Sequence, residues 1–453
     1  MPDDDAVAAG HSVDPAGWRA LFDELMFLVA GRFGRVEPRR TAREFVAGLL
    51  SPLERKNCWW LGEQAGHHDP QPMQRLLRSA VWDADAVRDD LRAFVAAQLG
   101  DAAGVLIPDE TGLLKKGTGS VGVQRQYSGT AGRIENSQVG VFLSYASARG
   151  RALTGRRVYL PRSWTGDRSG CTAAGVPAGV EFATKPELAL DMITGAVAAG
   201  MPAAWVASDE AYGDNGAFRA GVAALGLGYV LAVSRTHRVP AWPGGKRRLR
   251  ADHIAAALPH GCWQRISAGA GSKGPRWYDW AWVGAHQPGH SLLIRRGSNG
   301  ELAFYRCWSP APVTLATLAH VAGMRWAVEE GFQAAKSQVG LDHYQVRTWT
   351  GWHRFVTLAM LALAFLTACA AAAAPAPPAD PWHHARHGGP IPLTAAEIRR
   401  LFNGLVITPV RARMTTQLRT ISAIQHWSNW RRLHQGHARR SHYQRRLAAE
   451  LDP

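Results

Sequence analysis

The spacing of apolar and polar residues predicts a helical N-terminal region. Apolar side chains recur every three or four positions along residues 18–29 and again along 83–99, as in amphipathic helices. Between these stretches, Ser51 and Pro52 predict a helix start, because serine caps helices and proline favours the first turn. We therefore expect residues 1–100 to be helical.

Residues 101–238 change to a pattern that alternates strands with helices. The order is strand, loop, two strands, helix, strand, helix and strand, which predicts an α/β fold with a mixed sheet. Two short apolar runs lead directly into Asp109 and Asp209. We expect each acid to end a buried strand at the same sheet edge, although a solvated turn explains either acid alone.

The next segments supply a third acid. Residues 239–313 are rich in Trp, Gly and His and alternate like short strands, so we expect a β-rich insertion there. The helical period returns in 314–374, where Arg325, Glu329 and Lys336 fall along one line of a helix. This line is either an ordinary surface ion-pair row or a carboxylate flanked by two phosphate-binding cations.

The C-terminal third contains an uncharged run and a basic tail. Residues 355–374 carry no charge and are long enough to span a bilayer, but their alanine content favours a buried helix. Residues 375–390 read as a Pro-rich linker. The region 391–453 interleaves Arg and His with Trp and Tyr, which suits DNA contact or a solubilising tail.

Composition favours a polyanionic partner. Lys and Arg number 52 against 36 Asp and Glu, giving a formal charge of +16 and a pI near 10.2. The five cysteines are scattered without a CxxC pair, so neither a zinc site nor a disulfide framework is indicated. The acidic, polar N-terminus is unlike a signal peptide, and we expect a cytoplasmic protein.

Four ordered motifs resemble the DDE transposases of bacterial insertion sequences. They are PDETGLLKKGTGSVGVQRQYSGTAGRIENSQVGV, LPRSWTGD, SDEAYGDN and GLDHYQVRTWTGWHRF, within residues 39–366. The branch resembled carries a Tyr-x2-Arg-x3-Glu-x6-Lys signature. Arg325, Glu329 and Lys336 match this signature, whereas Ala322 stands at the tyrosine position.

The resemblance implies a ribonuclease-H-like catalytic core formed by 101–238 and 314–374, with 239–313 inserted before the last acid. It also implies that the helical region 1–100 recognises the DNA of the element's ends, although an ordinary helical subdomain with solvated basic faces would look the same. It implies metal-dependent cutting of DNA at the element's terminal inverted repeats and strand transfer into target DNA, by a dimer associated with the bacterial nucleoid and not with a membrane. Hard carboxylate oxygens suit two Mg²⁺ ions, with Mn²⁺ as a substitute. The expected catalytic and metal-binding residues are Asp109, Asp209 and Glu329, and the expected DNA-binding residues are Arg325, Lys336, Lys115, Lys116 and Arg347.

Several alternatives stay open from the residues alone. Glu110, Glu210 and Glu330 are neighbours of the three expected ligands and could substitute for them. An inactive DNA-binding relic or regulator, or a ribonuclease-H-like nuclease that cuts without joining, fits the same residues. A nicking and joining assay separates these three functions.

Overall fold

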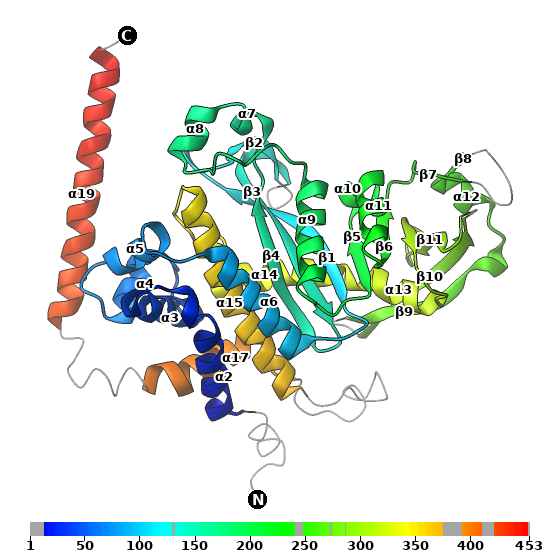
Figure 1. Cartoon of the computed structure of the whole chain (residues 1–453), viewed down its shortest axis with the longest axis horizontal. Helices are drawn as coiled ribbons and strands as arrows, with labels where there is room; N and C mark the ends of the chain where they lie inside the picture. The colour runs from blue at the N-terminus through cyan, green and yellow to red at the C-terminus, as the bar shows by residue number, and fades with distance from the viewer. Residues whose placement is uncertain are drawn as a thin grey trace, which may run out of the picture.

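A computed structural model describes residues 13–128, 132–240, 248–271, 274–285, 287–374, 392–409 and 421–451. The N-terminal region is helical, as expected (Figure 1). Its elements are α2 (Pro15–Leu28), η1 (Ala30–Arg32), α3 (Val36–Leu50), α4 (Cys58–Ala65), α5 (Gln71–Arg78) and α6 (Ala84–Leu99).

The two amphipathic helices predicted here are present. Helix α2 buries Trp18 and Phe22, and α6 begins at its N-cap Asp83. The predicted helix start at Ser51 is wrong, because Ser51 instead follows the last turn of α3. Helix α4 begins later because the Asn57 side chain accepts hydrogen bonds from two backbone N–H groups of its first turn.

The central elements form a mixed sheet flanked by helices (Figure 1). Strand β3 is antiparallel to both β1 and β4, and β5 and β6 continue in parallel on the other side of β1. This order agrees with a ribonuclease-H-like core, and the α/β class with a mixed sheet is confirmed. The elements are β1 (Val105–Leu114), β2 (Gln124–Ser128), β3 (Arg133–Ser147), β4 (Gly150–Val158), α7 (Arg162–Thr165), α8 (Arg168–Ala173), α9 (Lys185–Ala198), β5 (Trp205–Ser208), α10 (Glu210–Gly213), α11 (Gly216–Ala224) and β6 (Gly228–Val233).

Strand β1 does not end at Asp109, contrary to the prediction. It continues to Leu114 because β3 remains hydrogen-bonded beside it, from Val105 opposite Ala146 to Leu114 opposite Ser137. Strand β5 pairs only with the first two residues of β1. Asp109 therefore lies on the part of β1 that β5 no longer covers.

The segment after β6 is rich in strands and extends the same sheet. Strand β12 pairs with β6, and β11, β10 and β9 follow in order outwards. A small two-stranded sheet, β7 with β8, lies outside this series. The elements are β7 (Arg238–Pro240), β8 (Arg248–Arg250), α12 (Ala251–Ala257), η2 (His260–Cys262), β9 (Gln264–Gly271), β10 (Gly274–Gly284), β11 (His290–Arg296) and β12 (Leu302–Trp308).

The uncharged run forms most of a long helix in the core. Within the part of the chain that the structure describes, α15 (Trp349–Ala373) is the one helix long and apolar enough to cross a membrane. It packs against β4, α6 and α3, and residues such as Trp352, Leu358 and Phe365 are fully buried. The preferred prediction of a buried helix is confirmed.

The predicted helix that carries the third acid is divided at Arg325. Helix α13 (Leu315–Met324) ends there, and α14 (Trp326–Val339) begins directly after it. Further elements are α17 (Ala395–Phe402), η3 (Asn403–Ile407) and α19 (Ile421–Leu451). The predicted linker 375–390 lies outside the described residues.

Candidate active site

Side-chain alternation along β1 separates Asp109 from its neighbour Glu110. Successive residues of a strand point to opposite faces of the sheet, so Asp109 and Thr111 share one face. Lys336 of α14 donates a hydrogen bond to Thr111 Oγ1 at 2.8 Å, which places α14 on that face. The Asp109 side chain is therefore directed towards the helix that carries Glu329.

Glu110 is held on the opposite face by two other groups. Its carboxylate pairs with Lys185 Nζ at 2.6 Å and accepts a hydrogen bond from the Tyr212 hydroxyl at 2.6 Å. Both partners belong to the α9 and α10 side of the sheet. These contacts favour Asp109 over Glu110 as the functional acid of β1.

Asp209 directly follows β5 and caps the short helix α10. Its side chain accepts a hydrogen bond from the backbone N–H of Ala211 at 3.0 Å. Burial, followed by the nearby Glu110 charge, raises the pKa of Asp209, while Arg325 acts in the opposite direction. Asp209 is thus a partly buried carboxylate with a like charge close by.

Asp109 has the more strongly perturbed carboxyl group. Burial and then the Asp209 charge raise the pKa of Asp109 to about 7, and Arg325 lowers it in part. Two carboxylates that share a low-dielectric site repel each other and hold protons more tightly. Asp109 and Asp209, a hundred residues apart in sequence, therefore form one electrostatic pair.

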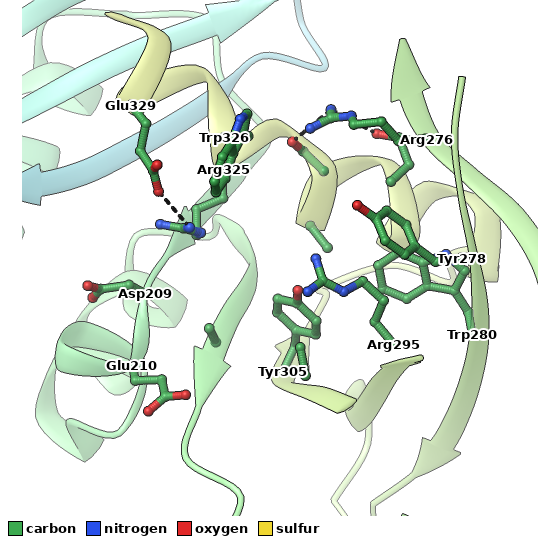
Figure 2. A pocket seen from close by; sticks show the side chains of 15 residues that line it. Asp209, Glu210, Arg276, Tyr278, Trp280, Arg295, Tyr305, Arg325, Trp326 and Glu329 are labelled. Atoms are coloured by element: carbon green, nitrogen blue, oxygen red, sulfur yellow. Dashed lines mark hydrogen bonds and ion pairs between the residues drawn. The ribbon is translucent and has the colours of Figure 1, made fainter. Parts of the chain in front are cut away.

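Glu329 is connected to this pair through Arg325. The Arg325 guanidinium contacts Glu329 Oε1 at 2.8 Å, and Figure 2 shows it between the Glu329 and Asp209 carboxylates. The neighbouring Glu330 instead pairs with Arg151 of β4 at 2.5 Å. Arg325 is thus the counter-charge of all three expected acids, rather than a cation directed at solvent.

Of the other expected DNA-binding residues, Lys115 and Lys116 directly follow β1, and Arg347 lies just before α15. Lys115 Nζ stands 3.5 Å from the centre of the Tyr344 ring, and burial lowers its pKa to about 8. Lys116 and Arg347 are exposed, and the Arg347 carbonyl accepts a hydrogen bond from Val121 N–H. Together with Lys336, these residues form a cationic approach to the acids.

A cavity of about 840 Å³ opens beside the acids, with Asp209 and Glu329 in its lining (Figure 2). Ala322, at the signature tyrosine position, also lines it. Our sequence reasoning missed the other functional candidates here, although alternating aromatic and basic residues in the late strands could have indicated them. These residues are Tyr278, Trp280, Tyr305, Trp326, Arg276 and Arg295.

The aromatic side chains of this cavity are held in place by their surroundings. Trp280 is buried and donates its indole N–H to the Ile266 carbonyl at 3.2 Å. The Arg295 guanidinium lies 4.7 Å from the centre of the Tyr278 ring. The cavity therefore combines flat aromatic surfaces with positive charge next to the acids, a combination suited to nucleotides.

The carboxylate oxygens of the acids are suitable ligands for a hard divalent cation. They are not yet arranged as a complete metal-binding site. Asp109 and Asp209 offer oxygen donors, and a cation between them would relieve the repulsion that raises the pKa of Asp109. Among the described residues, no three acidic, histidine or cysteine side chains are grouped closely enough to hold a metal ion as they stand. Glu329 is instead paired with Arg325.

The site therefore places the paired acids Asp109 and Asp209 beside cations and an aromatic cavity. The chain matches the model of the DDE superfamily endonucleases over residues 29–287, more than half of its length. It therefore belongs to this family, whose members generally use divalent metal ions. The match contains Asp109 and Asp209 and ends before Glu329.

Two further proteins are similar to this chain. A probable transposase for insertion sequence element IS701 from Microchaete diplosiphon is 29% identical over 198 residues. That alignment covers 43% of this chain and 49% of the relative, about half of its length. The solved piggyBac transposase synaptic complex with hairpin DNA aligns at a TM-score of 0.46 and 10% identity, over 92% of this chain and 85% of that one.

Proposed function

We propose that this protein is the transposase of a bacterial insertion sequence. It cuts DNA at the terminal inverted repeats of its element and joins the freed ends to target DNA by in-line phosphoryl transfer. The observation that carries this proposal is the grouping of Asp109, Asp209 and Glu329 around Arg325. The family match and the transposase similarity support it.

Asp109, Asp209 and Glu329 are the proposed metal ligands. Two Mg²⁺ ions, or Mn²⁺ in their place, would supply activation of the attacking oxygen and stabilisation of the leaving oxygen when bound. The chain's own contribution is to bring Asp109 of β1, Asp209 after β5 and Glu329 of α14 to the surroundings of Arg325. Glu329 is 42% exposed, so incoming DNA can reach it, whereas Asp109 is held in the sheet.

The cations beside the acids are proposed to bind the DNA backbone. Lys336 is fixed by Thr111 next to Asp109, and Lys115, Lys116 and Arg347 continue the positive surface away from the acids. Arg325 would transfer from Glu329 to a phosphate when DNA arrives, because a phosphate offers guanidinium a bidentate partner. The aromatic cavity takes a nucleotide next to the cut bond, by stacking.

The test incubates the full chain with a labelled duplex that carries its own element end, with Mg²⁺ or with EDTA. The wild type should cut at the end and join it to target DNA only with metal. Asp209→Asn should bind the duplex equally well and do neither. Cutting without joining would indicate a nuclease, and binding without cutting by the wild type would indicate a regulator or relic.

The active complex is proposed to be a dimer that bridges two DNA ends. Light scattering of the protein with and without end duplexes tests this directly. Two chains and two duplexes in one particle are the expected result. A particle of one chain with one duplex, at concentrations that support joining, would refute the dimer.

A further inference from the structure

Helix α19 (Ile421–Leu451) extends away from the rest of the molecule (Figure 1). Its 31 residues correspond to a length of about 46 Å at 1.5 Å per residue. Among the described side chains, its contacts with the body come from its first half and reach α4 and the loop that follows. The second half, residues 437–451, forms an arm of about 22 Å.

The first half is attached by a specific set of contacts. Trp427 is buried and donates its indole N–H to the His67 carbonyl at 3.2 Å. Arg431 pairs with Glu63 at 2.6 Å, and the Trp430 ring meets Trp59 edge-to-face at 5.2 Å. We call Trp427, Trp430 and Arg431 the aromatic anchor. Their contacts fix the direction in which the arm points away from α4.

The arm carries positive charge without acidic partners. No Asp or Glu occurs in the helix sequence until residue 450. Arg439, Arg440 and Arg445 are exposed, and among the described side chains none of them meets a carboxylate. Exposed arginines that meet no carboxylate among the described side chains leave a positive surface open to a negatively charged partner.

The charge pattern selects the class of partner. Duplex DNA carries one negative charge per about 1.7 Å of its axis, so an arm of about 22 Å can lie beside roughly a dozen phosphates. A row of arginines with no acid among them complements such a surface, whereas a protein partner with a mixed surface would place like charges together.

We propose that the outer half of α19 binds the phosphate backbone of duplex DNA without reading its sequence, while the aromatic anchor holds it in place. The proposal rests on DNA as the substrate of the proposed function. It adds a contact region that is separate in sequence from the acids and from the cations beside them. Contacts between this arm and DNA would strengthen the binding of the DNA that flanks the cut site.

The first experiment measures binding to a labelled 40-base-pair duplex of unrelated sequence, in EDTA, across a salt series. The variant replaces Arg439, Arg440 and Arg445 with Gln. Each phosphate contact contributes about 0.9 to the slope of log K against log salt, so the slope should fall by about 2.7. Affinity at 100 mM salt should fall about tenfold or more.

A matched control replaces three exposed arginines elsewhere, Arg19, Arg35 and Arg149, with Gln. It removes the same charge and should leave the salt slope unchanged. An equal loss of slope in both variants would overturn the proposal, because net charge alone would then explain binding. Circular dichroism of each variant confirms that the fold is retained.

A second readout does not depend on charge. A photo-crosslinking benzoyl-phenylalanine placed at the exposed Gln444 should attach to DNA under illumination. Crosslinks only to a second copy of the chain, or none at all, would overturn the proposal. Neither experiment requires cleavage, so an inactive enzyme would contradict the proposed function while leaving the arm's binding measurable.

Discussion

Replacing Asp109 with Asn should make the metal-free protein more stable at high pH. The folded protein raises the pKa of Asp109 from 3.8 to about 7, chiefly by burial and then by the Asp209 charge. Protonated Asp109 therefore favours the folded state, and this contribution is lost as pH rises from about 4 through about 7. The full loss corresponds to about 4 kcal/mol. The Asn side chain is neutral at every pH and avoids this loss.

The assay is urea unfolding followed by tryptophan fluorescence, in EDTA, between pH 4.5 and pH 8. At pH 8 the unfolding midpoint of Asp109→Asn should exceed that of the wild type, and at pH 4.5 the difference in unfolding free energy should shrink to about a quarter of its value at pH 8. Glu54→Gln, which removes an exposed carboxylate, serves as the charge-matched control and should show no such pH dependence. Added Mg²⁺ should stabilise the wild type and have little effect on Asp109→Asn. Equal midpoints at pH 8 would refute the electrostatic reasoning.

Three further predictions concern the acids and one buried lysine. Glu329→Gln should reduce cutting at least a hundredfold in a gel assay, whereas Glu330→Gln, which loses only its pair with Arg151, should stay within a fewfold of wild type. Arg325→Gln removes the counter-charge of the acids, so Mn²⁺ binding measured by electron paramagnetic resonance should tighten severalfold while DNA binding weakens; unchanged Mn²⁺ affinity would contradict this role. Lys56 is buried and donates hydrogen bonds to the carbonyls of Leu49, Ser51 and Gln338. Lys56→Met should therefore lower the free energy of unfolding by about 3 kcal/mol or more, because these buried acceptors lose their donor. A urea midpoint equal to wild type would contradict that prediction.

The local elements and the candidate acids could be predicted from short-range patterns. Helix α9 begins at Lys185 because Thr184 and Glu187 form a reciprocal cap within four residues, a signal that short-range sequence contains. Periodicity along residues 18–29 and 83–99 likewise predicted α2 and α6. The spacing of Arg325, Glu329 and Lys336 identified the third acid's helix through a family resemblance. All of these signals are contained within short stretches of consecutive residues.

The chain's β1 shows what local patterns could not determine. The apolar run indicated a strand that ended at Asp109, yet pairing with β3 carries the strand on to Leu114. That pairing partner lies more than twenty residues away. Its hydrogen bonds to β1 cannot be recognised from the order of apolar and polar residues within β1 itself. The position of Asp109 beside the open edge is therefore a consequence of sheet assembly.

Patterns in the sequence alone indicated most of the helical and extended segments, which acids could bind metal, and that a polyanionic partner is expected. Only the tertiary structure decided that Arg325 is the counter-charge of three acids, and that Tyr278 and Tyr305 line the cavity beside them. It also decided that the basic tail is a projecting helix anchored on α4. The physical reason is that helix and strand periods depend on neighbouring residues, whereas burial and charge pairing depend on groups brought together from distant parts of the chain.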